Sequence, residues 1–238
     1  MERWICYRCL AIDCEMMPST SSPPIEFSGR DIRCIRGERV VFTGLNFAVA
    51  AGGALLLSGP NGSGKSSLLR VMAGLLPAAS GVLRRDGADI RGDLESHRAS
   101  LHYVGHLDAV KPVLSVTENL AFWAGMRSSD RNAACLVDGA LDRFGLASLG
   151  DMPARLLSAG QRRRLNLARL VASQAPLWLL DEPTVALDAV SVKTMVGCIA
   201  DHRAGGGMVV LATHTDLGIE AASMIALDDF FVTAEETK

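Results

Sequence analysis

The sequence predicts an α/β fold, in which a mixed sheet with an antiparallel part packs around a buried helix and an inserted segment is helical. Three observations lead to this expectation. Short apolar runs at 55–57, 177–180 and 208–212 are typical of buried strands. A glycine-rich segment at 59–64 joins the first run to a stretch with helical spacing of apolar residues. Residues 107–174 repeat that helical spacing over most of their length.

The remaining elements follow from local patterns and turn signals. Gly37 marks a turn between two apolar segments, and Asp86-Gly87 is a hairpin signal. Ser115 and Glu118 have the spacing of a helix capping box. The further strands expected are 32–35, 40–49, the hairpin 81–90, 100–105 and 224–227. The helices expected are 67–74, 116–126, 133–144, 161–173, 190–202 and 215–222.

One of these helices carries a run of arginines on its polar side. The run comprises Arg162, Arg163 and Arg164, with Arg169 two turns further on. A charge run on a helix is more often a solvated face than a direct ligand contact. We therefore expect these side chains to point into solvent.

Composition and charge exclude several classes of protein. The chain has 238 residues, a hydrophobic content of 49% and a formal net charge of −2. This balance is typical of a folded globular protein and provides no basic field, so no nucleic-acid partner is expected. The apolar runs are far shorter than the ~20 residues that cross a bilayer. The chain is therefore not expected to form a membrane path by itself.

Residues 1–24 differ in character from the rest of the chain. They hold three of the six cysteines and end in a stretch rich in proline and serine, at 18–24, which is typical of disorder. Cys6-x-x-Cys9 lacks the second pair that a metal site needs, so reduced thiols are favoured over a structural metal. No apolar signal-peptide core is present. We expect a disordered or non-native leader, and translation that begins at Met16 or Met17 is one hypothesis.

A phosphate-binding loop is predicted at 59–67, where the sequence fits GxxxxGK[ST] between a strand and a helix. Glycines permit the backbone conformations that let amides wrap a phosphate, and the helix N-terminus adds positive potential. Lys65 can reach the β- and γ-phosphates of a nucleotide, and the Ser66 hydroxyl can ligate Mg²⁺. The expected phosphate-binding residues are Gly59, Pro60, Asn61, Gly62, Ser63, Gly64, Lys65, Ser66 and Ser67.

Two carboxylates follow the buried strand at 177–180. A strand that ends in acidic residues is the second half of a phosphate-loop ATPase site. Asp181 is expected to help hold Mg²⁺, mostly through water, and Glu182 to accept a proton from the attacking water. The plainer alternative for both residues is a helix cap at the strand end.

A third motif lies directly before the arginine-bearing helix. Taken alone, Ser158 is an ordinary N-cap, although a helix N-terminus also suits an anion. Together with the phosphate loop and the acidic pair, this motif completes a set that resembles the ATP-binding subunits of ABC transporters over residues 25–227. The segment matches that family's LSGGQ signature with alanine for one glycine, and it consists of Leu157, Ser158, Ala159, Gly160 and Gln161.

The resemblance implies a P-loop NTPase fold of ABC type, with an ATP-binding domain at 25–228, a helical subdomain at about 107–174 and a tail at 229–238. It implies a homodimer, in which the signature segment of one subunit contacts the γ-phosphate held by the other. Integral membrane subunits are the further partners implied. Asp188 matches the family's dimer-contact loop, and His214 matches a histidine that contacts the γ-phosphate.

Three positions depart from the family pattern. Gly53 replaces an acidic residue common in its turn, with no derived consequence, and the other two bear on the site. His106 lies where the family usually has a glutamine. Its ring can still hydrogen-bond to Mg²⁺-bound water or to the attacking water, but it adds a group that titrates. Arg36 falls near the position of an aromatic residue that stacks on adenine. A guanidinium plane can stack in its place.

Residues 103–112 and 118–123 resemble, more narrowly, the ATP-binding subunits of the bacterial cytochrome c maturation system, described as haem exporters. This likeness implies that ATP hydrolysis powers haem export or release at the cytoplasmic face of the inner membrane, with the membrane subunits of that system as partners. Trp123 is then either a contact to those subunits or a helix core aromatic.

Three alternative functions remain open. The first is an ABC-type ATPase for a different transported substrate. The second is a soluble ABC ATPase acting on ribosomes or DNA, and the single phosphate loop and the lack of a heptad run count against it. The third is a small-molecule phosphotransferase, and the signature segment counts against that function.

Overall fold

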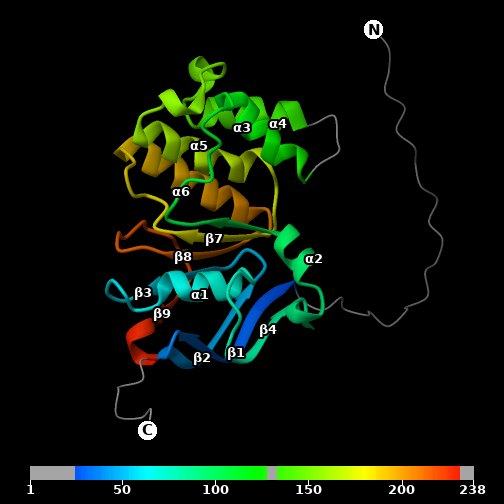
Figure 1. Ribbon diagram of the computed structural model, residues 1–238, viewed down its shortest axis with the longest axis vertical. Coiled ribbons are helices and arrows are strands. Elements are labelled where there is room, and N and C mark those ends of the chain that lie inside the picture. The colour runs from blue at the N-terminus through cyan, green and yellow to red at the C-terminus, as the bar shows by residue number, and fades with distance from the viewer. Residues whose placement is uncertain (1–24, 128–132, 231–238) are drawn as a thin grey trace, which may run out of the picture.

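The computed structural model describes residues 25–127 and 133–230 (Figure 1). The expected leader at 1–24 and most of the expected tail lie outside the described residues. Among the helices that are described, none combines the length and the apolar character needed to cross a membrane.

The strands form two separate sheets, and this arrangement confirms the α/β prediction with its antiparallel part. The antiparallel sheet has the strand order β2-β1-β4-β5, and the other sheet is parallel with the order β6-β7-β8-β3-β9. The antiparallel strands are β1 (Glu26–Arg36), β2 (Arg39–Ala50), β4 (Ser80–Arg85) and β5 (Ala88–Asp89). The parallel strands are β3 (Ala54–Ser58), β6 (Leu101–Val104), β7 (Leu177–Asp181), β8 (Met208–Ala212) and β9 (Ala222–Ala226).

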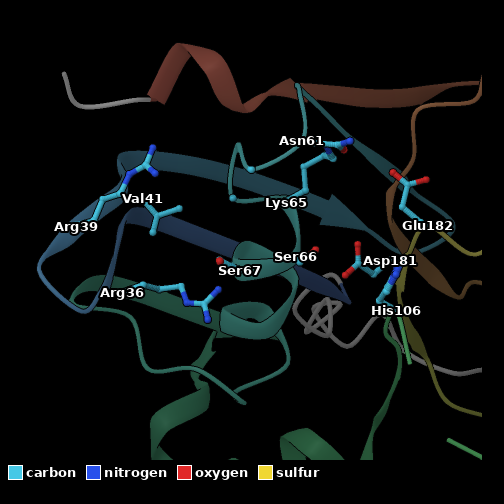
Figure 2. A pocket seen from close by; sticks show the side chains of 12 residues that line it. Arg36, Arg39, Val41, Asn61, Lys65, Ser66, Ser67, His106, Asp181 and Glu182 are labelled. Carbon is cyan, nitrogen blue, oxygen red and sulfur yellow. The ribbon is translucent and has the colours of Figure 1, made fainter. Parts of the chain in front are cut away.

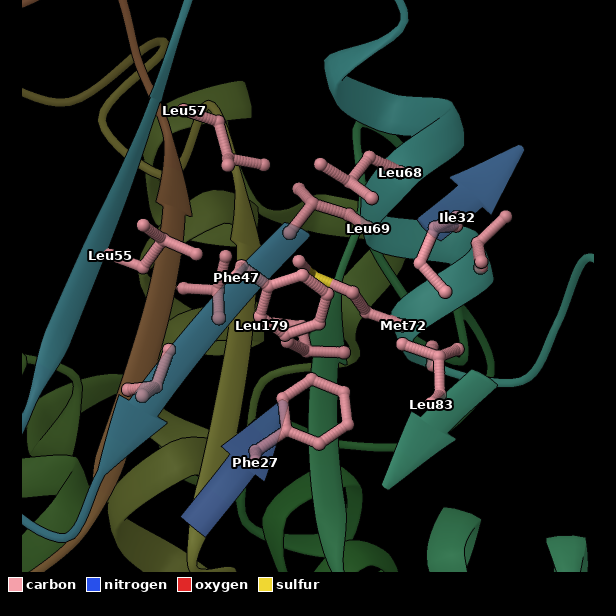
Figure 3. Packing of buried hydrophobic residues seen from close by; sticks show 14 of the residues in the cluster. Phe27, Ile32, Phe47, Leu55, Leu57, Leu68, Leu69, Met72, Leu83 and Leu179 are labelled. Carbon is pink, nitrogen blue, oxygen red and sulfur yellow. The ribbon is translucent and has the colours of Figure 1, made fainter. Parts of the chain in front are cut away.

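Helix α1 (Lys65–Met72) lies between the two sheets and is enclosed by them (Figure 1). Its side chains Leu68, Leu69 and Met72 have no exposed surface. Figure 3 shows them pointing at a cluster that includes Phe27 of β1 and Leu179 of β7. Each fully buried side chain of this size stabilises the fold by roughly 1.5–3 kcal/mol. The packing therefore fixes the N-terminus of α1 relative to both sheets.

The other helices lie mostly on the far face of the parallel sheet, with α5 and α6 nearest the strands and α3 and α4 outermost (Figure 1). The α-helices are α2 (Leu94–Ala99), α3 (Val116–Gly125), α4 (Ala133–Arg143), α5 (Ala159–Ala172) and α6 (Ala189–Ala204). Short 3₁₀ turns occupy Ile90–Gly92, Ala147–Leu149, Ala154–Leu156 and Leu227–Phe230. The capping box expected at Ser115 and Glu118 is present at the start of α3.

The helix expected at 215–222 is absent from the structure, so that prediction is wrong. The chain leaves β8 through an irregular segment and enters β9 at Ala222. Local side-chain bonds explain the difference, because Asp216 Oδ1 accepts from the Gly218 amide at 2.9 Å and Thr213 Oγ1 accepts from the Thr215 amide at 3.1 Å. Such turns compete with the backbone pattern of a helix. Gly218 also has a φ of 62°, which no α-helix contains.

The expectation of a solvated arginine face is also wrong for two of its members. Arg163 is 5% exposed and Arg169 is 4% exposed. This face of α5 packs against the ends of β6 and β7, and the two arginines donate hydrogen bonds to backbone carbonyls there. Arg169 Nη2 donates to the Tyr103 carbonyl at 2.6 Å, and burial lowers the pKa of Arg169 to about 10. Arg162 and Arg164 are half-buried.

Candidate functional site

A cleft of about 630 Å³ opens at the N-terminus of α1 (Figure 2). The turn between β1 and β2 forms one side, and the segments that follow β6 and β7 form the other. Lys65 lies between these two sides. The residues that line the cleft are Arg36, Arg39, Val41, Asn61, Gly62, Gly64, Lys65, Ser66, Ser67, His106, Asp181 and Glu182.

The loop at 59–64 has a backbone that only glycine adopts readily. Gly59, Gly62 and Gly64 have φ values of 133°, 84° and 98°. At Gly64 a Cβ would also lie 2.6 Å from Val41 Cγ1, so both backbone and space require glycine there. Gly64 is the N-cap of α1 and provides no side-chain cap, which leaves the first amides of the helix available to an anion.

The Lys65 side chain folds back across the loop. Its Nζ donates to the carbonyls of Gly59 at 2.5 Å and Pro60 at 3.0 Å, and Lys65 is only 7% exposed. The same nitrogen lies 3.2 Å from His214 Nε2. A buried ammonium is thus fixed beside the amides of the loop. The neighbouring Ser63 hydroxyl is buried and has no hydrogen-bond partner in the described part of the chain.

Asp181 is the last residue of β7 and Glu182 follows it, at the opposite side of the cleft. Asp181 is 3% exposed, and within the described residues no ion pair involves its carboxylate. Glu182 has a φ of 46°, a left-handed conformation that non-glycine residues seldom adopt. Its amide donates to the Ala212 carbonyl at 2.9 Å, and its buried Oε1 accepts no hydrogen bond from any residue that the structure describes.

His214, on the segment after β8, lies between Lys65 and Glu182. Its Nε2 lies 2.9 Å from Asn61 Oδ1, 3.2 Å from Lys65 Nζ and 3.5 Å from Glu182 Oε1. One ring nitrogen cannot both accept from Lys65 and donate to an oxygen, so its tautomer decides which neighbour it binds. The contact between Asn61 and His214 could not be predicted from the sequence, because the loop pattern GxxxxGK[ST] accepts any residue type at position 61.

The turn between β1 and β2 contributes more to the cleft than the sequence indicates. Arg36 lines the cleft, as do Arg39 and Val41, which sequence reasoning missed. Arg36 and Arg39 face each other across the hairpin register, so the turn places both guanidinium groups at one end. The signal available was the Gly37 turn, which puts flanking residues side by side. His106 lies at the other side, exposed (Figure 2).

Several predicted site residues are not among those that line this cleft. Gly59, Pro60 and His214 contact Lys65 at its edge, and Ser63 belongs to the same loop as Gly59 and Pro60. Two further predicted groups make no such contact with Lys65 among the described residues and also lie outside the lining of the cleft. The segment Leu157–Gln161 and Asp188 are not among the residues that line it. Ser158 forms a capping box with Gln161, with N–H to oxygen distances of 3.2 and 2.8 Å. Asp188 caps α6 by accepting from the Ser191 amide at 2.7 Å, and this bond lowers the pKa of Asp188. A Cβ on Gly160 would lie 3.3 Å from the Ala186 carbonyl, so these two segments adjoin.

Comparison with known proteins gives concordant likenesses. The family described as ABC transporter matches residues 42–185. The chain is 57% identical over 210 residues to the "Cytochrome c biogenesis ATP-binding export protein CcmA" of Paramagnetospirillum magneticum, covering 88% of the chain and 97% of that protein. The protein of the same name from Rhodospirillum rubrum is 56% identical, with 87% of the chain and 88% of that protein covered.

Solved structures agree with this result. One described as the ATP binding subunit of an ABC transporter has a TM-score of 0.76 at 20% identity, covering 84% of the chain and 86% of its own, and this likeness shows the fold. The cbiO1 protein of Clostridium perfringens, described as part of the ABC transporter complex cbiONQ, has a TM-score of 0.69 at 26% identity, covering 81% and 79%. The phosphate loop, the paired carboxylates and these likenesses lead to one conclusion: the chain belongs to the ABC transporter family, as an ATP-binding subunit.

Proposed function

We propose that this chain hydrolyses Mg²⁺-bound ATP to drive an export complex that serves cytochrome c biogenesis, in which the step powered is haem export or release. One observation carries the enzymatic part. The loop at 59–64, Lys65, the acidic pair and His214 come from distant parts of the sequence and meet around one cleft. The names of the relatives carry the biological part.

The residues of the cleft fit a nucleotide triphosphate. Its volume of about 630 Å³ lies within the ~300–1,000 Å³ typical of small-molecule sites. Lys65, the free amides of α1 and the two guanidinium groups of Arg36 and Arg39 supply positive charge. We assign the phosphates to the loop and α1, and the adenine end to the hairpin with Arg36 and Arg39.

A divalent cation also fits. The Ser66 hydroxyl and the Asp181 carboxylate line the same cleft, and oxygen ligands of this kind are those that Mg²⁺ prefers. Asp181 is buried without an ion pair among the described residues, which suits a carboxylate that neutralises a metal. Bound there, Mg²⁺ would neutralise charge that develops on the phosphates.

The chemical step falls to residues on the β7 side of the cleft. We assign Glu182 as the general base, because its buried Oε1 is free to accept the proton of the attacking water. His214 Nε2 lies within reach of the base, the loop and Lys65, and its tautomer decides which of them it binds. His106 lies across from Lys65 and is assigned to orient water or Mg²⁺-bound water.

The signature segment acts on a second copy of the chain. Leu157–Gln161 and Asp188 lie outside the chain's own cleft, so in our proposal they complete the cleft of a partner in a homodimer. The Ser158 hydroxyl oxygen accepts from the Gln161 amide, and its hydrogen therefore remains available to a phosphate oxygen. The N-terminus of α5 adds its positive potential.

The membrane partners dock, in our proposal, near α3 and the segment that precedes it. Leu107 and Val113 are 85% and 78% exposed there, and Leu156 nearby is 64% exposed. Trp123 is half-buried, and the Arg169 guanidinium carbon lies 4.6 Å from the centroid of the Trp123 ring. The Trp123 and Phe122 rings meet edge to face. We assign Trp123 to the helix core and the exposed residues to the docking surface. The chain would then sit at the cytoplasmic face of the inner membrane.

Deletion of the gene, followed by haem staining of c-type cytochromes, tests this function. We expect haem attachment to be lost, restored by the native gene and not restored by Glu182→Gln. Normal haem attachment in the deletion strain would refute the cytochrome role and leave an ABC ATPase with a different transported substrate. Restoration by Glu182→Gln would instead separate the role from hydrolysis.

A further inference from the structure

The guanidinium of Arg163 uses every donor it has on two neighbouring segments of the chain. Its side chain leaves α5 and is 5% exposed. An arginine has five N–H donors in a planar fork, and five acceptors surround this one. These acceptors are the carbonyls of Gly105, Asp181, Glu182 and Pro183, at 3.2, 3.4, 2.7 and 3.3 Å, and Asp108 Oδ1 at 3.1 Å.

The two segments are those that carry proposed catalytic groups. Gly105 and Asp108 flank His106 on the segment after β6. The other acceptors are the carbonyls of Glu182 and of its two neighbours in the sequence. Strand pairing holds these segments only at their start, because β6 ends at Val104 and the β7 pairing ends with the bond from the Glu182 amide to the Ala212 carbonyl. The single guanidinium therefore joins the His106 segment to the Glu182 segment beyond the sheet.

A second polar side chain, that of Asn166, also binds the segment that carries His106. Asn166, one turn along α5 from Arg163, donates from Nδ2 to Asp108 Oδ1 at 3.2 Å and accepts the Ala109 amide at 3.4 Å. Asp108 neutralises the buried guanidinium, since Arg163 and Asp108 form an ion pair with side-chain exposures of 6% and 27%. The buried guanidinium of Arg163 thus has both a neutralising charge and a full set of hydrogen bonds, which is the condition for a rigid buried polar network.

Glu182 needs such a support. Its left-handed backbone, with a φ of 46°, costs about 1–3 kcal/mol and persists only where neighbours hold it. Arg163 Nη2 makes its shortest bond to the carbonyl of this residue. We infer that Arg163 is a positioning residue for ATP hydrolysis, holding the Glu182 carboxylate and the His106 ring in fixed relation on one side of the cleft. This inference rests on the proposed role of Glu182 as the base.

The test compares two matched lysine variants of the full-length chain. Arg163→Lys keeps the charge but offers three donors in place of five. Arg164→Lys is the control, because Arg164 bonds to the carbonyls of Phe144 and Gly145, away from the cleft. The measurements are kcat and KM for ATP hydrolysis, ATP affinity by fluorescence of a trinitrophenyl nucleotide, and the thermal unfolding midpoint.

We expect Arg163→Lys to lower kcat by about 10–100-fold, since small misplacements of catalytic groups have effects of this size. ATP affinity should stay within about threefold, because none of the hydrogen bonds that Arg163 makes within the described residues reaches the phosphate loop. Arg164→Lys should change neither quantity by more than about twofold. Native kcat in Arg163→Lys would overturn the inference. So would a loss of ATP affinity equal to the loss of kcat, which would indicate general damage to the site.

A combined variant separates this inference from the proposed function. If Arg163 acts through Glu182, adding Arg163→Lys to Glu182→Gln should lower single-turnover hydrolysis no further, because residues that act as a unit are not additive. A further tenfold loss would overturn the inference while leaving Glu182 as the base. If Glu182→Gln alone hydrolyses at the native rate, the proposed base fails, and the inference fails with it.

Should Arg163→Lys not fold, Asp108→Asn provides the same test. Asparagine retains an acceptor oxygen for Arg163 and Asn166 but removes the neutralising charge. We expect a loss of about 3–10-fold in kcat with unchanged ATP affinity. A native kcat in Asp108→Asn would then overturn the inference.

Discussion

Substitution of Gly64 by alanine separates two reasons for glycine in the loop. Its φ of 98° imposes strain of about 1–3 kcal/mol on any residue with a side chain. The new Cβ would also lie 2.6 Å from Val41 Cγ1, and overpacking of this kind adds about 1–3 kcal/mol. We therefore expect Gly64→Ala to lower the free energy of unfolding by about 2–6 kcal/mol in urea titrations with an unchanged m-value.

Gly62 provides the matched control for this prediction. Its φ is 84°, but a Cβ there would meet nothing within 4 Å. Gly62→Ala should therefore carry the strain alone, about 1–3 kcal/mol. Val41→Ala should relieve Gly64→Ala and not Gly62→Ala, with a coupling energy of about 1 kcal/mol or more in a double-mutant cycle. Equal losses for the two glycine variants, or no coupling to Val41, would refute the argument from crowding.

Three further predictions concern charge and titration. Lys65→Ala should weaken or abolish ATP binding, because it removes a cation from the phosphates; fluorescence of a trinitrophenyl nucleotide checks this, and unchanged affinity contradicts the assignment. Glu182→Gln should keep ATP binding and lower hydrolysis by about 10²–10⁴-fold, the scale of a general base; phosphate release measures it, and full turnover removes Glu182 from that role. Burial lowers the pKa of His102 to about 3, so His102 stays neutral in the fold while the unfolded chain takes up a proton near pH 6.5. Its contribution to stability is present above pH 6.5 and is lost as the pH falls toward 3. Between pH 7 and pH 5 the native chain should lose about 2 kcal/mol more than His102→Gln in urea titrations, and parallel losses would contradict this.

The sequence predicted the elements whose signals are local and repeated. The buried strands, the phosphate loop, the capping box at Ser115, the N-cap at Ser158 and the Asp86-Gly87 hairpin all have patterns that span a few neighbouring residues. The order of strands in the two sheets was not accessible, because the pairing joins segments far apart in the chain. The same limit hid Arg39 and Val41, whose place in the cleft depends on how the hairpin lies over α1.

Charge patterns misled where burial depended on neighbours in space. Arg163 has the sequence environment of a solvated arginine, yet unpaired carbonyls after β6 and β7 draw it inside the fold. The helix expected at 215–222 failed for the opposite reason. There a purely local competitor, the turn at Asp216, prevails over a weak helical pattern. The roles of the signature segment and of Asp188 remain predictions, because they concern a second subunit.

The left-handed backbone at Glu182 changes the side of the sheet to which a side chain is directed. Along β7 successive residues alternate, so that Leu177 and Leu179 face the core with α1 while Trp178 and Leu180 face the helices beyond. Continued alternation would direct Asp181 to the α1 side and Glu182 away from it. The reversal of φ breaks this parity, and consecutive carboxylates both line the cleft. A metal ligand and a base can thus occupy adjacent positions in the sequence, because the backbone leaves the extended strand conformation at Glu182.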